Sequence, residues 1–278
     1  MTDSAIPAAP HAARKVRSRS HHGDVFDDPY EWLRDKDDAS VVAHIEAENA
    51  YTDARTAHLA GLREQIFQEI KGRTLETDLS VPTRRGAWWY FSRTEEGKQY
   101  GIHCRAPLAS PDDWTPPVPE GALPGEQVLL DGNAEADGEE FFSLGTFEVS
   151  TDGRLLLYGV DTSGDERYTL RVRDLDTGAT LPDVIEGTFA GASLSPDGRF
   201  VVYSTVDDAW RPDKVWLHEL GTSVADDALL FHESDDRFWV GAGFTRSDRY
   251  LVIGVGSSIT SEEWLLPADD LRGEPRVI

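Results

Sequence analysis

The chain has 278 residues, 39% hydrophobic and 10% aromatic, which is enough to bury a core in one large domain or two ordinary ones. Its 27 basic and 51 acidic residues leave a net charge of −24, which would repel a phosphate backbone and argues against nucleic acid as a partner. Cationic peptides would be attracted, although the simpler explanation is an acidic surface that keeps the protein soluble.

No apolar run reaches the roughly 18 residues that a membrane span needs, so we expect no membrane partner. The first 24 residues hold no apolar stretch typical of a secretory signal. The single Cys104 excludes a disulfide framework within the chain. These features together predict a cytoplasmic location.

Residues 1–21 are rich in Ala, Pro, Ser and basic side chains and predict a disordered tail. Residues 22–74 predict a helical N-terminal segment. Asp37 or Asp38 is a suitable N-cap for its first helix, and Gly72 is a suitable end for its second. The second helix is indicated by apolar residues at steps of three and four, namely Leu59, Leu62, Ile66 and Ile70.

From residue 75 onward, short apolar runs alternate with Gly, Asp and Pro. Residues 88–91 and 100–104 predict two strands joined by a turn, and residues 128–130 predict another strand. The proline-rich stretch 109–125 between them predicts a loop.

An internal repeat is the most informative feature. "STDGRLLLYGV" at 150–160 recurs as "SPDGRFVVYSTV" at 195–206 and more weakly as "TRSDRYLVIGV" at 245–255. Each copy is followed by a second apolar strand, at 167–175, 213–220 and 261–271 respectively. A period of about 40–50 residues built from short antiparallel strands is typical of β-propeller blades.

We therefore predict a mainly β fold: an incomplete β-propeller of about four blades over residues 75–278, preceded by the α-helical segment. Another strand is expected to begin in "GEPRVI" at 273–278. An open arc of blades would expose sheet faces and edges, so we expect the ring to be unfinished within this chain.

Catalytic and metal-binding patterns are absent from the sequence. The G-x-S-x-G turn of α/β-hydrolases does not occur, and neither Ser193 nor Ser258 fits it. Cys104 is expected to be a small buried residue, and the His21–His22 pair to be solvated rather than ligating. No cofactor-binding motif is present. We therefore assign no catalytic and no metal-ligating residue.

Several long segments resemble oligopeptidase B (protease II), a branch of the prolyl oligopeptidase family of serine peptidases. The resemblance is carried by "GDVFDDPYEWLRD" (23–35), "EIKGRTLETDLSVP" (69–82), "YFSRTEEGKQYGIHCR" (90–105), the segment 126–178, which includes "DTSGDERY", and "RPDKVWLHELGT" (211–222) and "DDRFWVGAGFTRSDRYLVIG" (235–254). It extends over nearly everything from His22 to the end of the chain.

The resemblance implies a seven-bladed propeller joined to a C-terminal α/β-hydrolase domain, which is absent from this chain. Such enzymes cleave short peptides after Arg or Lys with a Ser–Asp–His triad. That triad would lie beyond residue 278. The helical segment would pack on the hydrolase domain, and the propeller would restrict substrate access. The implied partners are short basic peptides and that domain, with no cofactor, and the chain alone is expected to be inactive.

Six residues in the matching motifs are given an expected role. Glu166, in "DTSGDERY", is a candidate for a polar contact with substrate or across the domain interface. Turn and packing roles are expected for the other five, Lys98, Gln99, Tyr100, Arg211 and Lys214. The alternative function is a non-catalytic propeller module that binds peptides or proteins through its loops. The helical segment favours the enzyme, because a free-standing propeller does not need it.

Overall fold

The computed structural model describes residues 8–117 and 122–278 and divides the chain into two compact units. The first unit ends at Leu75 and the second begins at Glu76. The sequence-based boundary, between residues 74 and 75, lies one residue earlier. Residues 1–7 of the expected tail and residues 118–121 of the proline-rich loop lie outside the described residues.

The first unit begins with a hairpin that the sequence did not predict. Strand β1 (Arg17–His21) pairs with β2 (Asp24–Asp28) in antiparallel register. His22 and Gly23 form the turn with positive φ at both positions, the geometry of a tight hairpin turn. The expectation of disorder up to residue 21 is therefore wrong for β1, because a two-residue turn and a ladder of backbone hydrogen bonds order an otherwise polar segment.

Helices make up the rest of the first unit: a short 3-10 helix, η1 (Glu31–Arg34), then α1 (Ala39–Thr56), a 3-10 turn, η2 (Ala57–Leu59), and α2 (Ala60–Arg73). Asp38 caps α1 and accepts a hydrogen bond from the Ser40 amide at 2.6 Å. Helix α2 continues one residue past the expected end at Gly72. The apolar side chains of the predicted stripe, such as Ile66 and Ile70, remain exposed at 47% and 62%.

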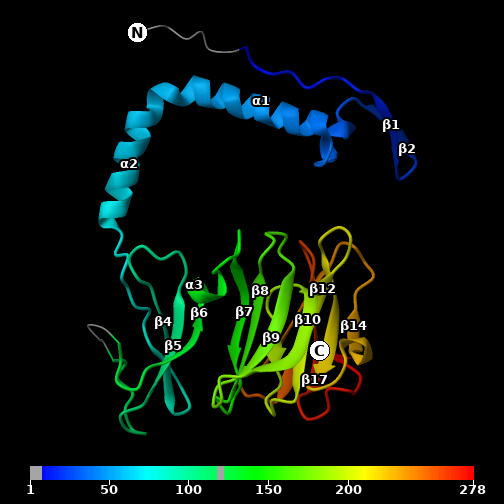
Figure 1. The fold of residues 1–278 in the computed structure, drawn as a ribbon. Coiled ribbons are helices and arrows are strands. Elements are labelled where there is room, and N and C mark those ends of the chain that lie inside the picture. Colours follow the sequence, from blue (N-terminus) through cyan, green and yellow to red (C-terminus); the bar gives the residue numbers. More distant parts are fainter. Residues whose placement is uncertain (1–7, 118–121) are drawn as a thin grey trace. The chain divides into compact units, whose positions relative to one another are not determined.

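The second unit consists of four sheets, each an antiparallel meander of four strands in chain order (Figure 1). Sheet 1 contains β3 (Thr83–Arg85), β4 (Trp88–Arg93), β5 (Ile102–Pro107) and β6 (Gln127–Asp131). Sheet 2 contains β7 (Ser143–Val149), β8 (Leu155–Asp161), β9 (Tyr168–Asp174) and β10 (Thr180–Thr188).

Sheet 3 contains β11 (Ser193–Leu194), β12 (Phe200–Val206), β13 (Pro212–Glu219) and β14 (Ala228–His232). Sheet 4 contains β15 (Trp239–Phe244), β16 (Tyr250–Gly256), β17 (Ser261–Pro267) and β18 (Arg276–Val277). The short helix α3 (Gly132–Glu135) connects sheets 1 and 2, and the 3-10 helix η3 (Val224–Asp226) precedes β14.

The repeated motif forms the turn between the first two strands of a sheet. In sheet 2 the Ser150 hydroxyl lies 2.6 Å from an Asp152 carboxylate oxygen and accepts the Leu155 amide at 2.9 Å. In sheet 3 the Ser195 hydroxyl makes the same pair of contacts, with Asp197 and the Phe200 amide. The Gly that follows each Asp has a positive φ of about 70–80°, so the repeat marks a local turn geometry.

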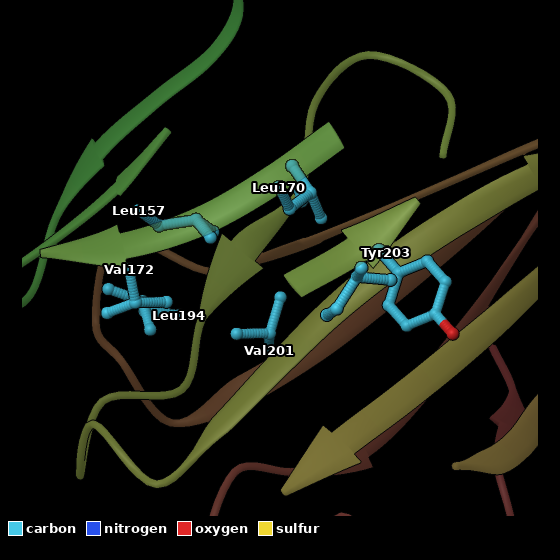
Figure 2. Close-up of a cluster of buried hydrophobic side chains, with 8 residues drawn as sticks. Leu157, Leu170, Val172, Leu194, Val201 and Tyr203 are labelled. Carbon is cyan, nitrogen blue, oxygen red and sulfur yellow. The ribbon is translucent and has the colours of Figure 1, made fainter. Parts of the chain in front are cut away.

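Apolar side chains from facing sheets form the core. Leu157, Leu170 and Val172 of sheet 2 pack with Leu194 and Val201 of sheet 3 (Figure 2). Similar clusters join sheets 1 and 2, and sheets 3 and 4. No strand among residues 8–117 and 122–278 pairs between sheets 1 and 4. The second unit is thus four successive blades of a β-propeller, as the repeat predicted.

Candidate functional site

All connections between the second and third strands of a sheet lie at one end of the blades, because every blade is a meander in chain order (Figure 1). These four turns, 94–101, 162–167, 207–211 and 257–260, define what we call the hairpin end. The chain also enters the second unit here, since the Thr94 hydroxyl donates to the Glu76 carbonyl at 2.7 Å.

The first turn of the hairpin end is attached to the link between sheets 1 and 2. The Asn133 side chain accepts the Tyr100 amide at 3.0 Å and donates to the Tyr100 carbonyl at 2.9 Å. The Tyr100 ring packs edge-on against Phe142, with ring centroids 4.9 Å apart. Tyr100 therefore fixes this turn by packing.

The second turn carries Glu166 and is held by the buried carboxylate of Asp161. Asp161 accepts the amides of Ser163 at 2.8 Å, Gly164 at 2.9 Å and Glu166 at 2.9 Å. Burial would raise the pKa of Asp161, but these backbone donors outweigh it and the pKa lies below its ordinary value. The carboxylate thus stays ionised and shapes the turn.

Glu166 itself has a φ of +58°, a left-handed conformation that non-glycine residues rarely adopt. Its side chain is exposed, and its carboxylate forms no hydrogen bond or ion pair with any residue that the structure describes. The turn therefore presents a carboxylate that is free to contact something outside the second unit.

The third turn is attached both to the second turn and to the link between sheets 3 and 4. The Arg167 guanidinium lies over the Trp210 ring, 4.2 Å from its centroid. Arg211 is buried; its Nε donates to Asp207 at 3.0 Å, and its Nη1 donates to the carbonyls of Asp235 and Phe238 at 3.0 and 2.9 Å. Arg211 is therefore a structural residue.

The remaining motif residues divide into two groups. Lys214 forms an ion pair with the adjacent buried carboxylate of Asp213 and is part of the packing of sheet 3. Lys98 and Gln99 are exposed at the first turn, and their side chains form no hydrogen bond or ion pair with a described residue. Together with Glu166, they are the motif residues whose polar groups remain free.

The candidate nucleophiles considered from the sequence are not activated. Cys104 is 1% exposed, and burial, with Glu126 nearby, raises the pKa of its thiol to about 12. Ser193 lies on β11 and Ser258 is exposed in the turn 257–260, and neither hydroxyl bonds to a histidine among the described residues. Cys104 is thus the small buried residue expected from the sequence.

No cluster of three or more His, Cys, Asp or Glu side chains able to hold a metal occurs in the described part of the chain. Within those same residues, no helix has the length and apolar character to cross a bilayer.

Comparisons with known proteins match this arrangement. Residues 10–278 match the family model for the N-terminal β-propeller domain of prolyl oligopeptidase. The chain belongs to the prolyl oligopeptidase family. It is 39% identical over 272 residues to dipeptidyl aminopeptidase BI from Pseudoxanthomonas mexicana, and 32% identical over 265 residues to protease 2 from Moraxella lacunata.

Solved structures of the family have the same fold. Oligopeptidase B from Leishmania major matches with a TM-score of 0.86 at 28% identity, over 98% of this chain. Oligopeptidase B from Trypanosoma brucei, with covalently bound antipain, matches with a TM-score of 0.84 at 29% identity. The chain spans 37% of the length of each of the two relatives above and 39% of these two structures.

Proposed function

We propose that this chain is the access-limiting N-terminal part of an oligopeptidase B-like serine peptidase that cleaves short peptides after Arg or Lys. Family membership supports a peptidase. The contact with substrate or with the hydrolase domain is assigned to the hairpin end because the carboxylate of Glu166 is free there, on a turn fixed by Asp161. A carboxylate held without an internal partner suits a cationic group on a substrate or a neighbouring domain.

The proposed catalytic machinery is a Ser–Asp–His triad in a C-terminal α/β-hydrolase domain outside residues 1–278. We propose that this domain faces the hairpin end, because residues 76–79 enter the second unit there. Exposed apolar side chains on α1 and α2, including Ile45, Leu62 and Ile66, would pack on the same domain. The cytoplasmic location expected from the sequence belongs to this proposal.

A test on the isolated 278-residue chain separates its role from catalysis. Purified chain is expected to leave arginyl and lysyl amide substrates unhydrolysed, whereas the protein with the complete hydrolase domain is expected to hydrolyse them. Turnover by the chain alone that a serine-directed inhibitor abolishes would refute the proposal. The coding sequence after Ile278 gives an independent test, because the enzyme requires a G-x-S-x-G motif followed by Asp and His.

A second candidate activity is the release of dipeptides from a free N-terminus. It is favoured by the 39% identity to a protein named dipeptidyl aminopeptidase. Glu166 could then bind the substrate ammonium group by a charge-assisted contact.

Peptides with free and acetylated N-termini distinguish the two activities. An aminopeptidase should lose at least tenfold in kcat/KM on acetylation, and a Glu166→Gln variant should lose this discrimination. Equal rates on both peptides would favour the endopeptidase.

If neither activity is encoded, the alternative remains a propeller module that binds peptides through its loops. A stop codon directly after Ile278, with a stable folded product, would select that module. Binding of an Arg-containing peptide to the chain, lost in Glu166→Gln, would then be the expected result.

A further inference from the structure

A fully buried histidine lies at the junction of the second and third blades. His218, on β13, has no exposed surface. Its Nδ1 lies 2.7 Å from Oδ1 of Asp227, which follows η3 in the same blade. Its Nε2 lies 3.1 Å from Oδ1 of Asp183, which belongs to β10 of the preceding blade. The imidazole therefore bridges two carboxylates that belong to different sheets.

Both carboxylates are themselves held by donors. The Gly221 amide donates to Asp183 Oδ1 at 2.5 Å, and the Tyr203 hydroxyl donates to Asp227 Oδ2 at 2.8 Å. In Figure 2 the Tyr203 oxygen points away from the apolar cluster that its ring joins. Burial, and then Asp227, raise the pKa of Tyr203 above its usual range, so the phenol keeps its proton and remains a donor.

No lysine or arginine in the described ranges pairs with Asp183 or Asp227. The nearest ionic group along β13, Glu219, is paired instead with Arg199 at 3.1 Å and Arg272 at 2.8 Å. The cation that could offset the two buried carboxylates must therefore come from His218 itself.

The proton count follows from the hydrogen-bond geometry. A neutral imidazole has one N–H and one lone pair, so one of its nitrogens would face a carboxylate oxygen with no proton between them. A buried carboxylate left in that arrangement is strongly destabilising. Each carboxylate also accepts a further donor, Asp227 from the Tyr203 hydroxyl and Asp183 from the Gly221 amide, so both groups are arranged as acceptors. An imidazolium, which carries a proton on both ring nitrogens, donates one hydrogen bond to each of the two carboxylates.

We infer that His218 is held as an imidazolium between Asp183 and Asp227, and that this carboxylate–imidazolium–carboxylate cluster is an ionic lock between the second and third blades. The lock is sensitive to pH in a defined direction. It is intact while both ring nitrogens carry protons, and it weakens when alkaline pH removes one of them.

The neighbouring junctions are built differently, which makes the lock specific to one interface. Between the first and second blades, Arg85 and Arg173 donate to the carbonyls of Val149 and Leu129 at 2.8 and 3.0 Å. Between the third and fourth blades, a large apolar cluster is accompanied by Arg211 on backbone carbonyls. Arginine does not titrate near neutral pH. Alkaline weakening is therefore expected first between blades two and three.

The direct test is nitrogen NMR of the 278-residue chain labelled with ¹⁵N at histidine. The pKa of an ordinary histidine is about 6.5, so its ring is largely neutral at pH 7.5. We expect one histidine to show protons on both ring nitrogens at that pH, and His218→Gln to remove its signals. If this variant does not fold, the signals are assigned by elimination with the other seven histidines. A single protonated nitrogen on His218 would overturn the inference.

Stability gives a second readout with a matched control. Asp227→Asn should lower the folding equilibrium constant roughly 100-fold or more, because it removes one partner of a buried ion pair. Asp226→Asn removes an equal charge from the adjacent exposed residue and should change that constant by about twofold at most. The difference between the two variants should shrink as the pH rises. Equal effects of the two variants, or a difference independent of pH, would refute the lock.

Discussion

The positive φ of Glu166 makes it possible to separate its effect on stability from its effect on function. A side chain in the left-handed region costs about 1–2 kcal/mol relative to glycine. Glycine lowers stability by about 0.5–1 kcal/mol through the greater freedom of the unfolded chain. Glu166→Gly should therefore raise the free energy of unfolding by about 0.5–1 kcal/mol, while Glu166→Ala, which keeps the Cβ and the strain, should change it little.

Thermal unfolding of the chain, followed by circular dichroism, measures this difference. For a domain of about 200 residues, each kcal/mol shifts Tm by roughly 2–4 °C. Glu166→Gly should raise Tm by about 1–4 °C above that of Glu166→Ala. Asp165→Gly is the control in the same turn: it has no positive φ to relieve, and it loses contacts with Ser163 and Arg167, so Tm should fall. Equal Tm values for the Gly and Ala variants would refute the reasoning from strain.

Activity of the complete enzyme supplies the other half of the test. If the carboxylate contacts substrate or the hydrolase domain, then Glu166→Gly, Glu166→Ala and Glu166→Gln should lose kcat/KM to a similar extent, although the first is the most stable. Loss of function with gained stability is typical of a residue retained for function. Unchanged kcat/KM in all three variants would show that the carboxylate is dispensable.

Three further predictions follow from the interior of the blades. Leu157→Ala, which empties a fully buried position between sheets 2 and 3, should lower the free energy of unfolding in urea by about 3 kcal/mol, whereas Leu229→Ala at a half-exposed edge position should change it by about 0.5 kcal/mol or less. Asp161→Asn should lower the free energy of unfolding by about 1–3 kcal/mol, because an amide cannot accept at both oxygen positions. Since the pKa of Asp161 is depressed, this difference from wild type should be present above pH 4. It should disappear in acid, where protonation of Asp161 has the same effect as the substitution. Cys104 should not react with iodoacetamide at pH 8 in the folded chain and should react after unfolding in urea; rapid labelling of the folded chain would contradict its burial and raised pKa.

The sequence predicted the middle of each blade better than its edges. The second and third strands of a blade carry long apolar runs because both faces are covered, as in β8 and β12, where most positions are buried. The outer strand β10 has polar and exposed positions and two register shifts against β9, so it shows no regular alternation. The two-residue strand β11 is too short for any periodic pattern.

In the first unit, the spacing of apolar residues predicted a helix correctly but did not predict burial of its apolar face. The periodic spacing of Leu62, Ile66 and Ile70 predicted a helix, and α2 forms there, but its apolar stripe is not buried within the described residues. The hairpin β1–β2 escaped prediction because its strands contain charged and polar residues and its turn has His22 before Gly23 instead of the usual Asn or Asp. Periodicity thus indicates which face of an element prefers burial, but not what covers it.

Polar residues at the hairpin end could be located from their motifs, but their roles could not be assigned in the same way. Arg211 and Glu166 both stand in segments shared with the family, yet Arg211 is buried on backbone carbonyls while the carboxylate of Glu166 has no partner in the second unit. The difference depends on contacts with residues more than 20 positions away, such as Asp235, which no local pattern encodes. Asp161 had a recognisable signal, because an Asp before Ser and Gly is typical of a turn that bonds its own backbone.

This division of roles explains how a blade end can carry a functional group. Turns fixed by their own charged residues, Asp161 in the second blade and Asp207 in the third, need no contribution from the remaining side chains to hold their shape. The carboxylate of Glu166 can therefore change without loss of the turn, provided that Asp161 remains. Asp161→Asn and Glu166→Gln should consequently differ in kind: the first should lower both stability and activity, and the second should lower activity alone. If Glu166→Gln were as destabilising as Asp161→Asn, Glu166 would be part of the turn's support, and the functional assignment of its carboxylate would fail.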